Sequence, residues 1–211
     1  MFSILEENKP KDKQVAMFVG GCVRKFLKNS GDLKYQVADT LAGEILKAAH
    51  TIRDCLSNGG KLLLMGNGGS AADSQHIAAE LIGRFKKERK AIPALALTVD
   101  SSTLTALGND YGFETIFSRQ IEALATPNDA VVGISTSGNS KNVILALNLA
   151  RKIGSKTIGL MGHEGGDMKD CVDIGIIVPS NDTARIQEVH ITIGHIICEI
   201  IEQDLINENK I

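Results

Sequence analysis

The sequence predicts an α/β fold of three layers, an αβα sandwich built on a five-stranded parallel sheet. From residue 61 onward, short runs rich in leucine and β-branched residues alternate with longer segments of helical periodicity, which is typical of βαβ units. Several short runs, such as KLLLMG and DAVVGIS, are apolar almost throughout, as expected of strands that helices cover on both faces. The expected strands are residues 61–66, 93–99, 129–136, 155–161 and 173–179.

A helical segment is expected to precede the sheet. Residues 33–56 carry apolar side chains at helical spacing, and the sequence SNGG at 57–60 provides a glycine helix stop. Residues 11–28 are also expected to be helical, although the glycine pair at 20–21 weakens that helix by about 1 kcal/mol per glycine.

The chain is long enough for one substantial core, with 211 residues of which 43% are apolar. We expect one compact domain, in which a helical segment, residues 1–57, packs on the core and at a subunit interface, followed by the α/β domain proper, residues 58–211. Residues 183–205 should form a last helix whose isoleucine-rich faces exceed what one flank of a sheet needs. Burial in a subunit interface is the preferred interpretation of those faces.

The composition of the chain indicates where the protein is located and which classes of partner are not expected. The net charge of −2, with both signs interspersed, gives no reason to expect nucleic acid or a membrane surface as a partner. Cys22, Cys55, Cys171 and Cys198 are scattered along the chain, which indicates reduced thiols rather than disulfides. The start lacks the pattern of a secretion signal, and no apolar run reaches the roughly 20 residues of a membrane span. We therefore expect a cytoplasmic protein.

A serine-rich loop, STSGNS, follows the apolar run VVGIS and precedes a helical segment. The start of a helix offers unpaired backbone N–H groups and partial positive charge, so hydroxyls placed there can hold a phosphate ester. Alternatively, Ser137, Asn139 or Ser140 only caps the helix. One cap needs one hydroxyl, whereas Ser135, Thr136, Ser137 and Ser140 supply four, and this excess favours a ligand.

A glycine-rich loop, GNGGS, contains Asn67, Gly68 and Gly69 and follows the first expected strand. Glycine lets a backbone approach a ligand closely, but the spacing is not that of a dinucleotide-binding fingerprint, so a nucleotide cofactor is not supported. A tight turn between the strand and the following helix, without any ligand, explains the glycines about as well.

His76 and Glu80 lie four residues apart on the next helix, and therefore on one face of it. Imidazole and carboxylate suit zinc or another divalent ion, and they also suit proton transfer next to a carbonyl. An isolated histidine–glutamate pair on a helix is usually an ordinary surface contact. Its place after a glycine loop at the carboxyl end of a strand, where open α/β sheets bind ligands, favours a site. His190, on the apolar last helix, is interpreted as a core residue.

Four stretches taken together, GNGGSAADSQHIAAEL, LTALGNDYGFETIFSRQI, GISTSGNSKNVILA and ARIQEVHITIGHIICEII, resemble the bacterial phosphoheptose isomerases of the sugar isomerase (SIS) domain superfamily. The resemblance covers roughly residues 32–204, and the first 30 residues do not share it. It implies a Rossmann-like five-stranded sheet and a homotetramer with active sites between subunits. The implied reaction converts sedoheptulose 7-phosphate to D-glycero-D-manno-heptose 7-phosphate, the first step toward the activated heptose of lipopolysaccharide or another surface polysaccharide.

The resemblance also implies roles for individual residues. Glu80 and His195 would be the catalytic acid and base, and one Zn²⁺ per subunit would be bound by His76, Glu80, Gln187 and His195. The sugar phosphate would be held by Asn67, Gly68, Gly69, Glu80, Asn109, Asp110, Ser135, Thr136, Ser137, Ser140 and Gln187.

The spacing of Gln187 and His195 constrains this ligand set. Eight residues on a regular helix span about 12 Å along the axis and about 80° around it, whereas metal–ligand bonds are about 2 Å long. Either the helix is distorted near Gly194 or the two ligands come from different chains, and the second explanation is favoured.

Two alternative functions of the chain would involve no catalysis. A related scaffold that binds the replication initiator shares the RIQE helix and the glycine loops, but it lacks the carboxylate and imidazole that stand here at Glu80 and His195. A sugar-phosphate-sensing regulatory domain would need the serine loop but neither metal nor base.

Overall fold

The computed structural model describes residues 9–211, with side chains from residue 20 onward, so the first eight residues of the expected segment 1–57 lie outside the described part. Five strands form one parallel sheet in the order β2-β1-β3-β4-β5. They are β1 (Leu62–Gly66), β2 (Ala94–Ala96), β3 (Ala130–Ser135), β4 (Lys156–Met161) and β5 (Ile174–Ile177). The predicted fold class and all five strands are confirmed. β2 is shorter than predicted, and as an edge strand it pairs only with β1.

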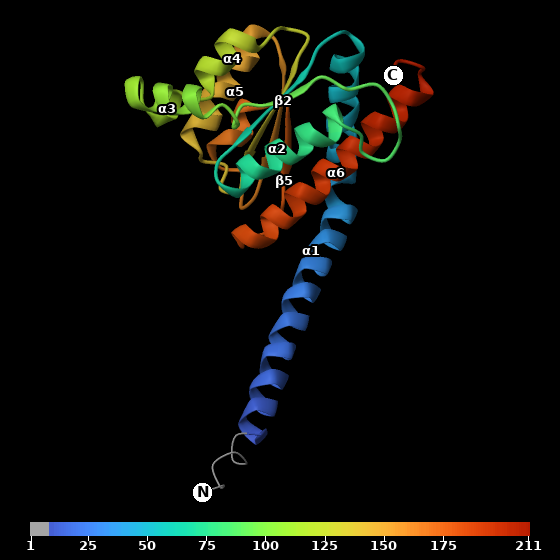
Figure 1. Cartoon of the computed structure of the whole chain (residues 1–211), viewed down its shortest axis with the longest axis vertical. Helices are drawn as coiled ribbons and strands as arrows, with labels where there is room; N and C mark the ends of the chain where they lie inside the picture. The colour runs from blue at the N-terminus through green and yellow to red at the C-terminus, as the bar shows by residue number, and fades with distance from the viewer. Residues whose placement is uncertain (1–8) are drawn as a thin grey trace, which may run out of the picture.

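Helices cover both faces of the sheet (Figure 1). Alternate side chains of β1 face opposite layers, with Leu62 and Leu64 in one core cluster and Leu63 and Met65 in the other. The first layer contains α1 (Lys9–Ser57), α2 (Gly69–Ile82) and α6 (Thr183–Asn207). The second contains α3 (Ser101–Asp110), α4 (Ser118–Leu124) and α5 (Lys141–Ile153), with the short 3₁₀ helices η1 (Phe113–Thr115) and η2 (Gly166–Cys171).

α1 is one continuous helix of 49 residues. The glycine pair at 20–21 does not interrupt it, because a cost of about 1 kcal/mol per glycine is small beside the packing of its second half. From Leu33 to Ile52, one side of α1 is buried against the body, whereas its first half projects away from the body (Figure 1).

α6 lies between two other helices of the same chain. Its buried side chains, which include Ile186, Ile193, Ile197 and Ile201, pack in the core cluster shared with α1, α2 and the sheet. α1 thus covers part of the surface that the sheet and α2 leave free, while Ile196 stays 40% exposed beside an apolar hollow between α1 and α6, so burial of that face in a subunit interface stays a prediction. No helix in residues 9–211 has the length and apolarity needed to cross a membrane.

The strand order creates a crevice between β1 and β3. The chain runs from β1 to β2 on one side of β1 and then returns to place β3 on the other side. The loops that follow β1 and β3 therefore diverge at the carboxyl ends of the strands, where ligands bind in open α/β sheets. Both loops singled out in the sequence, GNGGS and STSGNS, open onto this point.

Candidate functional site

α2 and α6 lie side by side, and their contacts occur at three successive levels. Gly69 meets Gln187, His76 meets His195, and the loop after α2 meets Glu202. Residue numbers rise in the same direction along both helices, so the two helices point the same way. The first two levels join a turn of α2 to a turn of α6, and the third joins the loop after α2 to α6.

The middle level brings three predicted ligands together from a single chain. The Nε2 atoms of His76 and His195 are 2.9 Å apart, and His76 Nε2 is 3.2 Å from Glu80 Oε1. One ligand atom from each of these three side chains lies within 4.8 Å of the other two. His76 is half-exposed, so the cluster is open to small molecules.

The cluster suits a divalent ion. Zinc ligands lie about 2.0–2.2 Å from the ion, which puts tetrahedral ligands about 3.3 Å from one another. The separations of 2.9 Å and 3.2 Å are close to that spacing. Two imidazoles and one carboxylate are also a common ligand set of zinc enzymes, in which the fourth position stays open. His76, Glu80 and His195 could therefore hold such an ion with small side-chain movements.

His76, Glu80 and His195 are called the metal-type cluster below. Gln187 contacts α2 at the first of the three levels, whereas the cluster of its own chain lies at the second. A Cβ atom on Gly69 would come within 1.9 Å of Gln187 Nε2, so the Gln187 amide occupies the space beside the glycine loop. α6 is an unbroken α-helix, so distortion near Gly194 does not bring Gln187 and His195 together. His195 reaches the His76–Glu80 pair within one chain, so the expectation that Gln187 and His195 come from different chains would require Gln187 to come from the second chain.

Asp73 is a residue of the site that the sequence reasoning missed. Its carboxyl faces the Gln187 amide, and its Oδ2 is buried without a hydrogen-bond partner among the described residues. Burial raises the pKa of Asp73, an effect that the charge of His76 and the Gln187 amide partly offset. The spacing of three residues from His76 could have revealed it, because i and i+3 share a helix face.

The serine loop places its hydroxyls together at the start of α5. Ser135 Oγ lies 2.9 Å from Ser140 Oγ and 3.4 Å from Ser137 Oγ. Ser140 occupies the N-cap position, yet within the described chain its side chain makes no capping hydrogen bond. The simple capping explanation therefore does not account for Ser140, and these hydroxyls converge beside the N-terminus of a helix of 13 residues.

The glycine loop and the serine loop are joined across the crevice. Asn67 and Asn142 exchange two amide hydrogen bonds of 2.9 Å, which link the end of β1 to the first turn of α5. These residues and Ser140 line a cavity of about 430 Å³ that is closed on another side by Gly112 and Phe113. The cavity is large enough for a small phosphorylated metabolite.

The predicted residues Asn109 and Asp110 are exposed at the end of α3, just before the residues that close this cavity. Asn109 Nδ2 donates to Asp110 Oδ1 at 2.8 Å. Neither residue lines the cavity itself, so their contact with the sugar stays a prediction.

Comparisons with known proteins place this geometry in a family context. Residues 25–162 match the model of the SIS domain. The chain is 58% identical over 174 residues to a phosphoheptose isomerase of Geotalea daltonii, covering 82% of this chain and 91% of that protein. It is 54% identical over 181 residues to the phosphoheptose isomerase of Aquifex aeolicus, covering 86% and 95%. The solved phosphoheptose isomerase of Neisseria gonorrhoeae superposes with a TM-score of 0.83 at 42% identity, covering 88% of this chain and 99% of that one.

Proposed function

This chain belongs to the phosphoheptose isomerases of the SIS-domain family, and we propose that its reaction takes place at the cluster of His76, Glu80 and His195. The enzyme is an aldose–ketose isomerase that converts sedoheptulose 7-phosphate to D-glycero-D-manno-heptose 7-phosphate in heptose biosynthesis. The observation that supports the location of the chemistry is the convergence of the two imidazoles and the carboxylate. A non-catalytic scaffold or sensor would need neither the convergence nor the carboxylate.

Glu80 is suited to act as the base. An aldose–ketose isomerisation moves a proton between adjacent carbons, and a single carboxylate can take it from one carbon and return it to the other through an enediol. His195, which meets the same point, is suited to exchange protons with the substrate oxygens. A divalent ion held by the cluster would polarise the carbonyl and hydroxyl oxygens and stabilise negative charge on them.

The phosphate end of the sugar is proposed to bind at the serine loop, with Ser135, Thr136, Ser137 and Ser140 around it. The support is the convergence of hydroxyls at the start of α5 and the adjoining cavity. Asn67, Gly68 and Gly69 would line the glycine-loop side, and Asn109 and Asp110 the rim. His76 lies seven residues beyond Gly69, about 10 Å along the axis of α2, so the sugar is proposed to run from the glycine loop along α2 toward the His76–Glu80 pair.

Zinc is the proposed metal, one ion per subunit, with His76, Glu80 and His195 of one chain as ligands. Gln187 would complete the set only from a second subunit, since within its own chain it lies beside Gly69. Free Cys55 and Cys198 are buried, which agrees with the proposed cytoplasmic location, where thiols stay reduced.

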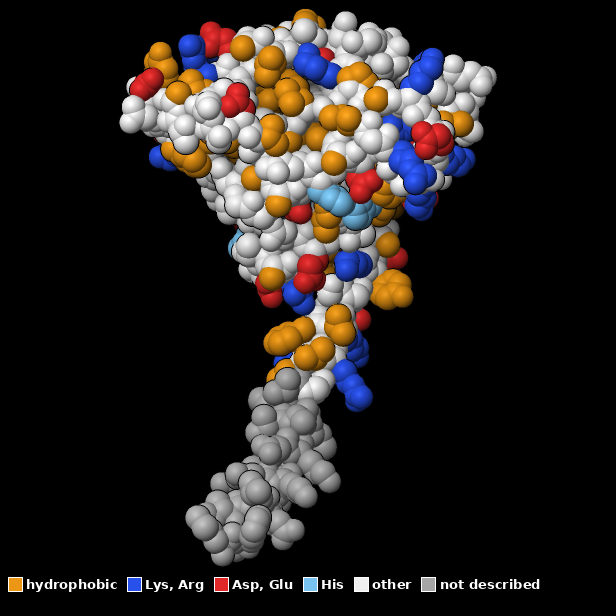
Figure 2. All heavy atoms as spheres, in the orientation of Figure 1, with side chains coloured by type: hydrophobic (Ala, Val, Ile, Leu, Met, Phe, Trp, Pro, Cys, Tyr) orange, Lys and Arg blue, Asp and Glu red, His pale blue; other side chains and the backbone are white. Residues whose placement is uncertain are grey.

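A homotetramer is the proposed assembly. Val23, Phe26 and Leu27 are exposed on the projecting half of α1, where hydrophobic side chains gather below the body (Figure 2). Further along the same helix, an apolar hollow of about 360 Å³ lies between α1 and α6. Exposed apolar surface of this kind marks interaction sites. In the proposed division, residues 1–57 pack on the core and serve this assembly, and residues 58–211 carry the sheet, a boundary supported by the end of α1 at Ser57.

The test replaces Glu80 by Gln, which keeps the shape of the side chain and removes the base. Exchange of the substrate C1 or C2 proton with solvent deuterium should stop, and turnover with it. Glu122→Gln, an exposed carboxylate paired with Arg119 on α4, is the matched control and should exchange normally. Unimpaired exchange in Glu80→Gln would rule out the proposed role. Incubation with a chelator should abolish turnover, and added zinc should restore it.

A further inference from the structure

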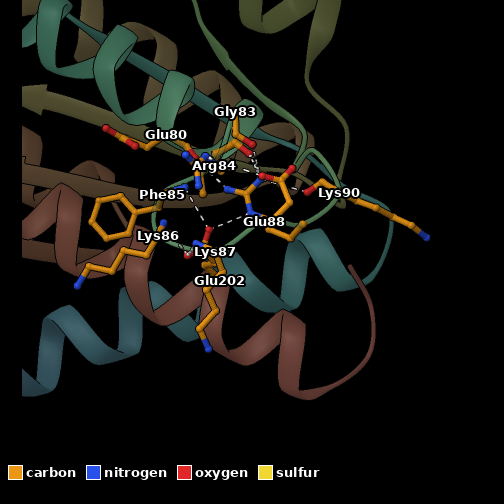
Figure 3. Close-up of polar contacts among 11 residues, drawn as sticks. Glu80, Gly83, Arg84, Phe85, Lys86, Lys87, Glu88, Lys90 and Glu202 are labelled. Carbon is orange, nitrogen blue, oxygen red and sulfur yellow. Dashed lines mark hydrogen bonds and ion pairs between the residues drawn. The ribbon is translucent and has the colours of Figure 1, made fainter.

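The third level of contact between α2 and α6 is a buried clamp formed by Glu202 and Arg89. Glu202, on α6, accepts three backbone N–H groups from the loop after α2, at 3.1 Å from Phe85, 2.9 Å from Lys86 and 3.0 Å from Lys87. Figure 3 shows the carboxylate of Glu202 facing this loop, with dashed lines to the backbone. Burial opposes ionisation of Glu202, but the N–H donors and the nearby guanidinium outweigh it and hold its pKa below the usual value.

Arg89 completes the clamp and caps α2. Its Nε donates to Glu202 Oε1 at 3.1 Å, and both side chains are almost fully buried, at 1% and 2% exposure. The guanidinium also donates to the carbonyls of Glu80 at 2.9 Å, Leu81 at 2.6 Å and Gly83 at 3.1 Å. The last carbonyls of a helix lack intrahelical partners, so one cation satisfies several of them at once.

The clamp is directly connected to the metal-type cluster. Arg89 holds the backbone carbonyl of Glu80, whose side chain belongs to the cluster. His195 and Glu202 are seven residues apart on α6, two turns along the same face. Phe85, whose N–H is bound by Glu202, has its ring centroid 5.7 Å from that of His195.

A buried cysteine lies between clamp and cluster. Cys198 is buried there with Glu80, Arg89 and Glu202 as its charged neighbours, and burial raises the pKa of its thiol to about 12. A neutral, packed side chain therefore separates the two groups, and displacement of one helix end is transmitted to the other by contact.

We infer that Arg89 and Glu202 are positioning residues for the isomerase, which set the separation of α2 and α6 at the level where Glu80 and His195 must meet. The inference rests on the proposed function of the cluster. Partners that orient metal ligands from outside the ligand shell affect metal affinity by about 10- to 100-fold, and small misplacements of reacting groups slow chemistry by similar factors. The serine loop lies between β3 and α5, whereas the clamp lies beyond the C-terminal end of α2, so phosphate binding should be spared.

The experiment compares Arg89→Met and Glu202→Gln with the wild-type enzyme. We expect kcat to fall by about 10- to 100-fold with KM changed little, and Co²⁺ affinity, followed by visible absorption, to fall by a similar factor. Amide hydrogen exchange of residues 85–87 should accelerate. Arg89→Lys, which keeps the charge but not the planar fork, should restore only part of each loss and serves if Arg89→Met does not fold.

Lys61→Met is the control for a purely structural effect. It breaks another ion pair with a buried carboxylate, 2.7 Å to Asp129, at the opposite ends of the strands. It should lower stability but leave kcat and Co²⁺ affinity intact. Arg89 and Glu202 variants that fold and keep the wild-type kcat and Co²⁺ affinity would overturn the inference. A Lys61→Met enzyme that is destabilised to the same degree and loses as much kcat and Co²⁺ affinity as those variants would also overturn it. A fully active Glu80→Gln enzyme would instead reject the proposed function, which separates the two failures.

Discussion

At the scale of single residues, Gly69 matters because of the side chain that fills the space beside it. An alanine Cβ there would lie 1.9 Å from Gln187 Nε2, the far end of a flexible side chain, so Gln187 should move while the backbone stays in place. Gly68 differs, because its φ of +56° disfavours any larger residue through the backbone itself.

Gly69→Ala should therefore leave stability nearly unchanged and lower kcat/KM as far as Gln187→Ala does. The two substitutions should also be non-additive, because both remove the same amide from its place. Kinetics of the two single variants and the double variant would measure this coupling. Full additivity would show that Gly69 acts independently of Gln187.

His190 is a buried histidine of the core, as the sequence predicted, and it gives the protein a specific pH dependence. Its Nε2 bonds to the Met161 carbonyl at 3.0 Å, and its Nδ1 is buried without a partner among the described residues. Burial lowers its pKa from 6.5 to about 4. The unfolded chain takes up a proton near pH 6.5 and the folded chain only near pH 4, so acid favours unfolding over this interval.

The free energy of unfolding should fall between pH 6.5 and pH 4, and His190→Gln should remove roughly 3 kcal/mol of that fall. Glutamine can still donate to Met161 but does not titrate. Urea unfolding of both proteins at several pH values would measure the difference. Parallel curves would mean that His190 does not titrate as its burial requires.

At the scale of elements, the serine loop and α5 form one unit for binding an anion. The hydroxyl of Ser140 is within 2.9 Å of Ser135 and, in the described chain, is not used as a cap, so its loss should hardly affect stability. A hydrogen bond to a charged group contributes about 1.5–3 kcal/mol, which corresponds to about 10- to 100-fold in affinity.

Ser140→Ala should thus raise KM and weaken competitive inhibition by inorganic phosphate by about 10- to 100-fold. Ser118→Ala, at the start of α4 and bonded to the Thr115 carbonyl, is the matched control and should behave like the wild type. An unchanged inhibition constant in Ser140→Ala would place the phosphate elsewhere.

At the scale of the whole molecule, the position of Gln187 on α6 bears on whether two subunits contribute residues to one active site. One chain brings His76, Glu80 and His195 together, but its own Gln187 lies beside Gly69. If Gln187 of another subunit completes the site, catalysis depends on assembly.

Equal amounts of Gln187→Ala and His195→Asn chains, each inactive alone, should then recover about a quarter of wild-type activity after subunit exchange, since half the sites keep His195 and half of those receive Gln187. Activity after mixing, with exchange verified by native mass spectrometry, is the measurement. Absence of recovery would assign Gln187 to the site of its own chain.

Several features could be predicted because they are local. Apolar runs indicated the five strands, and the spacing of His76 and Glu80 put both on one helix face whatever the rest of the chain did. The packing of α1 against α6 could not be predicted in this way, because the two helices are distant in the sequence.

The sequence by itself determined the fold class, the two loops at the strand ends and the His76–Glu80 pair, since periodicity and short spacings act within a few residues. Only the tertiary structure decided that His195 meets that pair within one chain while Gln187 sits beside Gly69, and that Arg89 and Glu202 join α2 to α6. These contacts join residues more than a hundred positions apart, and no local pattern specifies which turns of two helices face each other. The relative placement of the helices on the sheet decides it.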